Sequence, residues 1–213
     1  MEKLRQKAYA SFTEQLMTQA IRPGQFVSQR ELVDLTDMPL GAIRELIPRL
    51  EAEGLITTIP KRGMQIAPID FNLVRDAYQF RLAIEKEAVA LFTIQASEHL
   101  IEEVLENHVR IRDRSRSGDA SEQLENEAQM VDWGFHDLIV DEMRNRIVSD
   151  AYRVNSIKIR LIRHELTRIG GLVPHVMDEH LAILGAIKTR DVQGAVAALE
   201  RHINTARDRA LGL

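Results

Sequence analysis

Five of the six prolines lie in the first third of the chain, and only Pro174 falls in the remainder. A proline inside a helix removes a hydrogen bond and clashes with the preceding turn, so long uninterrupted helices are confined to the last two thirds. Apolar residues recur there three and four positions apart, which is the helical period. We therefore predict a mostly α-helical protein with a boundary near Ile69, giving two domains over residues 1–69 and 70–213.

Composition excludes several classes of protein. The chain has 213 residues, no cysteine and a formal net charge of −4. The absence of cysteine excludes disulfides, thiolate zinc sites and a cysteine nucleophile. No stretch approaches the roughly 18 apolar residues of a membrane helix, and the charged start MEKLR lacks the apolar core of a signal peptide. We expect a soluble, cytoplasmic protein whose overall charge does not point to nucleic acid.

The first domain is typical of a winged helix. The apolar pattern predicts three short helices, of which the second begins at a capping box made by Ser28 and Glu31. The third ends at Gly54, a good C-cap residue, and residues 55–67 then predict a two-stranded hairpin. A helix, a helix-turn-helix and a hairpin follow one another in this order.

A winged helix presents one slim helix to the major groove of DNA and a basic hairpin to the backbone or minor groove. The residues placed on these two surfaces are Arg44, Arg49, Lys61, Arg62 and Gly63. Arginines on a free helix face are often only solvated, and similar small modules also bind proteins. The residue pattern alone leaves these alternatives open beside DNA binding.

Four motifs lie along this domain: RPGQFVSQREL at 22–32, IREL at 43–46, RLEAEGLI at 49–56 and RG at 62–63. They resemble the DNA-binding domain of the GntR family of bacterial transcription regulators. The resemblance implies a homodimer that binds double-stranded DNA at a short inverted repeat. The chain departs from the family at residues 39–42, where PLGA replaces a Ser-Arg-Thr-Pro-like run, so Arg44 is the family contact that carries over.

From Asp70 onward the pattern predicts six amphipathic helices packed as an antiparallel bundle. Their expected ranges are 73–91, 100–112, 124–143, 147–166, 173–188 and 192–211. We expect the Asp191 side chain to cap the N-terminus of the last helix.

Three histidines and one aspartate fall on the inward faces of three of these helices. Asp132 and His136 are four positions apart, so both side chains reach one ion, and His180 and His202 lie on the apolar faces of the last two helices. Imidazole nitrogens with a single carboxylate suit zinc, nickel, cobalt or manganese and leave positions open to water or a ligand. Taken singly, each histidine also fits a hydrogen-bonded core residue.

Further motifs in this domain are DWGFH at 132–136 with Asn145 after it, EHLAILGAI at 179–187, Asp191 and His202. They resemble the metal-binding version of the FCD ligand domain, which is attached to GntR-type modules in the FadR subfamily. The resemblance implies a divalent transition metal, zinc before nickel, cobalt or manganese, with the ligands Asp132, His136, His180 and His202. Six helices rather than seven favour the VanR-like branch, and the metal set argues against an acyl-CoA effector.

Two arginines are candidates for binding an anionic effector. Arg81 matches an arginine common in the first helix of this domain, and Arg160 lies on the helix expected to cover the site. A guanidinium beside a metal can hold a carboxylate in a bidentate manner, which predicts a small organic or sugar acid as effector. A surface ion pair, such as that of Arg81 with Glu85, is an equally good interpretation.

The remaining histidines carry less weight. His99 and His108 lie in a charged helix, so we expect both to be solvated. His164 and His175 flank the glycine pair at 170–171 and could approach the cavity.

Two function classes compete for this chain. In the first, the bundle senses a small molecule and sets the spacing of two winged helices, as in a repressor. In the second, the metal activates water in a metal-dependent hydrolase with an accessory winged helix. The chain has no His-Glu-x-x-His motif, nucleophile elbow or phosphate loop, and Glu179 is turned about 100° from His180 on its helix. We therefore predict a ligand-responsive transcription regulator that is not an enzyme.

Overall fold

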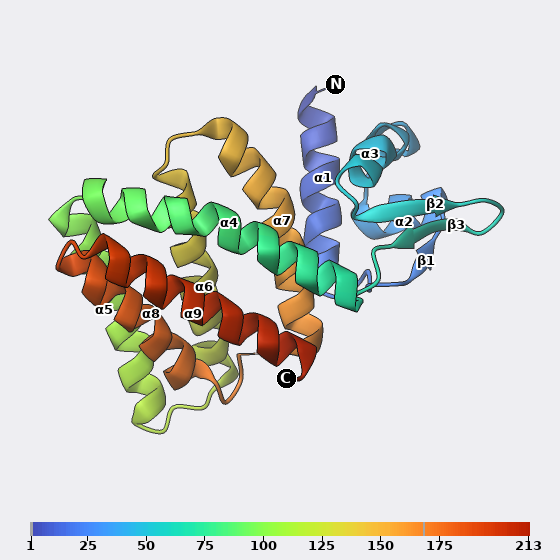
Figure 1. Cartoon of the computed structure of the whole chain (residues 1–213). Helices are drawn as coiled ribbons and strands as arrows, with labels where there is room; N and C mark the ends of the chain where they lie inside the picture. Colours follow the sequence, from blue (N-terminus) through green and yellow to red (C-terminus); the bar gives the residue numbers. More distant parts are fainter. Residues whose placement is uncertain (1, 168) are drawn as a thin grey trace.

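The computed structural model describes residues 2–167 and 169–213. Within them, three helices and a small sheet form the N-terminal part, and six helices form the rest (Figure 1). The elements are α1 (Glu2–Met17), β1 (Phe26–Val27), α2 (Gln29–Thr36), α3 (Leu40–Ala52), β2 (Ile56–Ile59), β3 (Gly63–Ile66), α4 (Phe71–Gln95), α5 (Glu98–Arg116), α6 (Glu122–Asp141), α7 (Arg146–Leu166), α8 (Val173–Lys188) and α9 (Val192–Leu211). The predicted fold class, a winged helix joined to a six-helix domain, is confirmed.

The winged helix is held together by local signals. The Ser28 side chain accepts from the Glu31 N–H, and the Glu31 carboxylate accepts from the Ser28 N–H, so the expected capping box begins α2. The sheet has the order β1-β3-β2 with antiparallel pairs. The sequence predicted β2 and β3 but missed β1, because two residues are too few to show the alternation of a strand.

Gly63 begins β3 at a position where only glycine fits. Its φ is +92°, and a Cβ atom there would lie 2.9 Å from the Val27 carbonyl oxygen of β1. Any other residue would meet both a strained backbone conformation and a steric clash. The glycine therefore lets the hairpin tip at Lys61 and Arg62 project beyond the sheet.

One helix of the second domain completes the core of the first. The apolar core of the winged helix comes from α1, α2, α3 and the sheet, together with Leu161 of α7, which is 3% exposed. Ile157 of α7 packs against the same core, and Gln19, just after α1, donates to the Glu165 carboxylate at 2.7 Å. Figure 1 shows α7 running beside α1 at the junction of the domains. The two domains thus share a packed interface.

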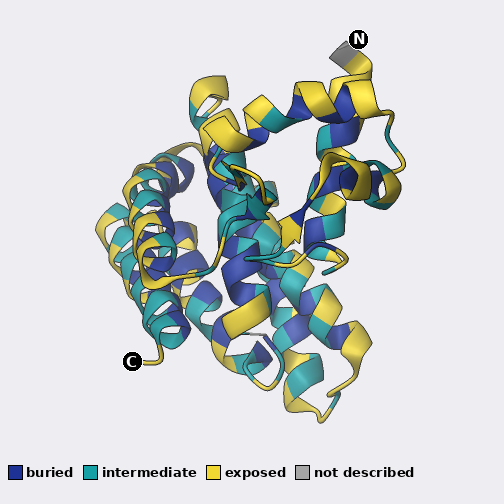
Figure 2. Cartoon of the chain, turned by 90° about the vertical axis from the view of Figure 1, so that its right-hand side faces the viewer, coloured by how far each residue is buried: buried dark blue, intermediate teal, exposed yellow. Residues whose placement is uncertain are grey.

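The six-helix domain packs α4 against α9 and α5 against α8; α6 packs against α4, α5 and α8, and α7 packs against α4 and α6. Side chains cap five of its helices at their N-termini: Asp70, Ser97, Ser121, Asn145 and Asp191. Figure 2 shows buried positions along the inner faces of the helices and exposed positions along the outer faces. None of the helices in the described ranges is both long and apolar enough to span a membrane.

Candidate functional site

Three of the predicted DNA contacts stand on the surface of the winged helix. Arg44 on α3 is exposed, and its Nε donates to the Gln29 Oε1 atom of α2 at 3.2 Å. Lys61 and Arg62 are exposed at the hairpin tip, where the Arg62 guanidinium lies 4.7 Å from the ring centroid of Phe26. Among the described residues none of these three cations forms an ion pair, so their charge is available to an anionic partner.

Arg49 is placed differently from the other three cations. Its Nε lies 2.8 Å from Glu53 Oε1, and its guanidinium lies 3.6 Å from the ring centroid of Tyr9 on α1. The Tyr9 hydroxyl donates to the other Glu53 oxygen at 2.7 Å. Arg49 therefore ties α3 to α1 in addition to any contact with DNA.

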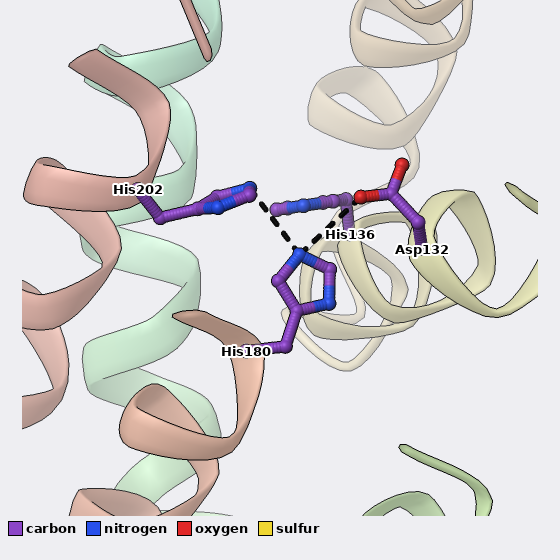
Figure 3. Close-up of side chains that lie close together, drawn as sticks. All are labelled: Asp132, His136, His180 and His202. Atoms are coloured by element: carbon purple, nitrogen blue, oxygen red, sulfur yellow. Dashed lines mark hydrogen bonds and ion pairs between the residues drawn. The ribbon is translucent and has the colours of Figure 1, made fainter. Parts of the chain in front are cut away.

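The four side chains predicted as metal ligands meet at one point inside the helical domain (Figure 3). Asp132 and His136 come from α6, His180 from α8 and His202 from α9. One ligand atom from each lies within 4.8 Å of the others, and all four residues are buried. The structure thus brings together residues that are up to 70 positions apart in the sequence.

Each of the three histidines has its Nδ1 atom engaged by another side chain. The pairs are His136 with Glu85 at 2.6 Å, His202 with Glu179 at 2.8 Å, and His180 with His108 at 3.0 Å. A histidine whose Nδ1 is occupied in this way presents its Nε2 to a metal, and the second partner fixes the orientation of the ring. All three rings are therefore oriented for coordination through Nε2.

The centre of the cluster contains polar atoms that lack ordinary partners. His136 Nε2 and Asp132 Oδ1 are buried and have no hydrogen-bond partner among the described residues. The Nε2 atoms of His180 and His202 lie 3.2 Å apart, and His180 Nε2 lies 3.4 Å from Asp132 Oδ1. A buried polar group without a partner costs about 1–3 kcal/mol. A divalent cation bound among them would be coordinated by all four ligand atoms, so these residues fit a metal.

The charge states also suit a metal. Burial raises the pKa of Asp132, but Arg163 and the neighbouring histidines outweigh burial and lower that pKa to about 2. Burial lowers the pKa of His202 to about 4 and takes the pKa of His180 well below its ordinary value. Near pH 7 the aspartate is therefore ionised and these two imidazoles are neutral, as metal coordination requires.

Two arginines predicted to bind an effector line a narrow cavity beside His136. The Arg81 Nε lies 2.7 Å from Glu85 Oε1, with both side chains buried, and Arg160 lies 2.7 Å from Asp137 Oδ2. The cavity volume is about 10 Å³, roughly the room for one water molecule. The ion pair of Arg81 with Glu85 therefore exists, but in the interior instead of on the surface.

The prediction that His108 is solvated is wrong. His108 is 1% exposed, and it lies seven positions after Ile101 and three before Ile111 on the buried stripe of α5. The charged residues around it obscured this spacing. His99 and His175 are exposed as parts of α5 and α8, and His164 is half-buried on α7; none of them joins the cluster of four.

Besides His108, sequence reasoning missed four residues as supports of the cluster: Glu85, Tyr152, Arg163 and Glu179. Glu85 accepts from the Tyr152 hydroxyl at 2.6 Å, and the Arg163 Nη1 donates to Asp132 Oδ2 at 2.5 Å. Glu179 points away from its neighbour His180, as expected, but reaches His202 on the next helix. A charged residue at a position on the buried face of a helix could have indicated two of them, because Glu85 and Arg163 both occupy such positions.

Comparison with known proteins gives two family matches and several relatives. Residues 4–66 match the bacterial regulatory proteins of the gntR family, and residues 76–205 match the FCD domain. The Nta operon transcriptional regulator of Aminobacter aminovorans is 27% identical over 190 residues, which cover 89% of this chain and 86% of the relative. The HTH-type transcriptional repressor GlaR of Escherichia coli strain K12 is 24% identical over 174 residues, 78% and 77% of the two chains. The solved structure of E. coli McbR/YncC superposes with a TM-score of 0.76 at 17% identity, over 95% of this chain and 94% of that one.

Proposed function

This chain belongs to the GntR family of transcription regulators and carries an FCD domain, and we propose that it is a repressor whose DNA binding depends on a metal and an organic acid. GntR-family regulators are not enzymes, and neither is this chain. The observation that carries the proposal is the convergence of four buried ligand atoms, two of which have no hydrogen-bond partner among the described residues.

We assign the functions to the two domains predicted from the sequence. Residues 1–69 bind DNA, and residues 70–213 hold the metal and the effector. Two copies of the chain, related by a two-fold axis, would bind a short inverted repeat. Arg44 would contact base edges while Lys61 and Arg62 contact phosphates, and Gly63 shapes the wing that carries them. Such a protein works in the bacterial cytoplasm, where its operator is.

The metal would be held by Asp132, His136, His180 and His202. Three imidazole nitrogens and one carboxylate oxygen suit zinc first and also nickel, cobalt or manganese. When bound, the metal supplies a positive charge that can coordinate the oxygens of a carboxylate. The chain's own part is to hold the imidazole rings in one orientation through the Nδ1 partners described above.

The effector would be a small carboxylate, such as a hydroxy acid or sugar acid, bound beside His136 within reach of Arg81 and Arg160. The cavity there is too small for such a molecule, so binding requires movement of a lining side chain. Arg160 is suited to this, because it is held by Asp137 and by the face of Trp133, at 4.8 Å, near the protein surface. A carboxylate could replace Asp137 as the partner of Arg160.

Operator binding across a panel of organic acids tests this function. The wild-type chain and His202→Ala are compared on a DNA fragment selected from genomic DNA. We expect one acid to release DNA from the wild type, through a coupling of about 1–3 kcal/mol, and no acid to release it from the variant. Release of both proteins by the same acid at the same concentration would place the effector site away from the metal.

A further inference from the structure

Helix α7 contacts both the metal cluster and the core of the winged helix, within a few residues of each other. Leu161 is buried in the winged-helix core, and Arg163 is 5% exposed and contacts Asp132. Two residues along an α-helix are about 3 Å apart and about 200° around the axis, so these two side chains leave α7 on opposite sides. The helix therefore joins the two regions through one rigid segment.

Asp132 divides its two oxygens between the metal cluster and α7. Its Oδ1 faces His180 Nε2 at 3.4 Å, and its Oδ2 accepts from Arg163 at 2.5 Å and from Gln129 at 3.3 Å. Gln129 lies on the same helix as Asp132, whereas Arg163 lies on α7. Both bonds end on an ionised carboxylate, but the Arg163 bond is shorter and carries a charge on the donor as well, so it is the stronger of the two links.

The junction leaves room for α7 to shift. An open pocket of about 590 Å³ lies beside the junction; it is lined mainly by the helical domain, including Trp133 of α6 and Arg163 of α7, and Met17 of α1 reaches its edge. Close-packed interiors transmit a displacement but do not absorb one, whereas a cavity on one side permits a small rotation of the helix. The end of α7 is thus fixed at Leu161 by packing and at Arg163 by Asp132, with the open pocket on one side.

We propose that Arg163 is a positioning residue that couples the metal cluster to the DNA-binding domain. Its guanidinium donates to Asp132 Oδ2, the oxygen that faces α7. Any shift of that carboxylate on metal or effector binding is therefore transmitted through α7 to Leu161 and α1. This inference rests on the proposed metal centre. It adds a route by which the state of that centre reaches the winged helix.

The test compares Arg163→Met with a matched control, Arg153→Met, in the full-length protein. Arg153 is also an arginine of α7 that pairs with an α6 aspartate, Asp137, at 2.6 Å, but Asp137 is outside the metal cluster. Metal content, operator affinity and hydrogen exchange of α1 are measured with and without zinc. Arg163→Lys serves as a second variant, because lysine keeps the charge but offers a single donor group in place of the arginine fork.

In the wild type and in Arg153→Met, we expect zinc to change operator affinity by about 5- to 150-fold and to slow hydrogen exchange in α1. In Arg163→Met the zinc should still bind and protect α6, α8 and α9, while the changes in α1 and in operator affinity are lost. Arg163→Lys should recover part of both, which a purely structural loss at this position would not produce.

Two outcomes overturn the proposal in distinguishable ways. If zinc protects α1 equally in the wild type and in Arg163→Met, the metal centre stands and the coupling through Arg163 is wrong. If the wild type binds neither zinc nor any of the alternative metals, the proposal of a metal centre is wrong, and the proposed coupling is wrong with it.

Discussion

The two domains bury different kinds of side chain. Every lysine and arginine of the winged helix is exposed, and among its described residues Thr36 is the buried polar one, with its hydroxyl bonded to the Leu32 carbonyl. Among its described residues the helical domain instead buries eight acidic, basic or histidine side chains: Arg81, Glu85, His108, Asp132, His136, Arg163, His180 and His202. The cationic side chains of the winged helix are thus accessible to a binding partner, whereas the buried charged side chains of the helical domain need oppositely charged or hydrogen-bonding partners within the protein.

Because of this difference, we expect substitutions of charged residues to affect mainly DNA binding in the winged helix and mainly stability in the helical domain. Replacing a surface cation of the winged helix that forms no ion pair, such as Arg44, should change DNA binding and leave folding unchanged. Breaking one contact of the buried network should change folding first, because an unpaired buried charge is expensive. The predictions below test this contrast, from the largest expected effect to the smallest.

Glu85→Ala should produce the largest loss of stability. Glu85 lies within hydrogen-bond distance of Arg81, His136 and Tyr152, and removing it leaves a buried guanidinium unpaired. We expect a decrease of about 3–5 kcal/mol in the free energy of unfolding, measured by urea denaturation. The control is Glu87→Ala on the exposed face of α4, with a change within about 0.5 kcal/mol. Equal stability of the two variants would show that the buried network is not a stability requirement.

Removing the metal should be the next largest effect. A ligand that binds only the folded state adds about 2.7–4.1 kcal/mol when its free concentration is about 100–1,000 times Kd. Calorimetry with and without a chelator should therefore show a lower Tm for the stripped protein. His136→Ala serves as the control, because a chain that has lost a ligand should respond little to the chelator. A Tm that is the same in both states of the wild type would contradict the account.

Arg44→Ala should have the smallest effect on folding and a clear one on DNA. If Arg44 contacts a guanine, operator affinity should fall by about 1–3 kcal/mol, measured by fluorescence anisotropy, while the free energy of unfolding changes by less than about 0.5 kcal/mol. Arg146→Ala on α7, whose side chain is 93% exposed, is the matched surface control and should leave operator affinity unchanged. An unchanged affinity in Arg44→Ala would remove this residue from the interface.

Periodicity predicted most of the fold, because long amphipathic helices and the capping box at Ser28 are encoded locally. In α4, however, the apolar residues Phe80, Ile84 and Leu91 are only partly buried. The buried stripe passes through Arg81 and Glu85 instead, one position further on. An apolar pattern cannot show charges that are buried because they pair with each other, and that pairing depends on residues from other helices.

The same reason limits prediction of the site. Asp132 and His136 share a helix face, so their proximity follows from spacing, and His180 and His202 fall on apolar faces. Their partners Glu85, His108 and Arg163 come from three other helices, and no local pattern states which helices meet. The four-residue cluster could therefore be predicted, whereas the network that orients it required the tertiary structure.

Elemental analysis of the purified full-length chain tests the central claim most directly, because it asks whether the buried charges of the helical domain exist to hold a metal. We predict about one divalent transition metal per chain in the wild type, as expected for a single site with four protein ligands. The Asp132→Ala/His180→Ala double variant, which removes two of the four donors, should contain none. Full metal content in the folded double variant would contradict the assignment.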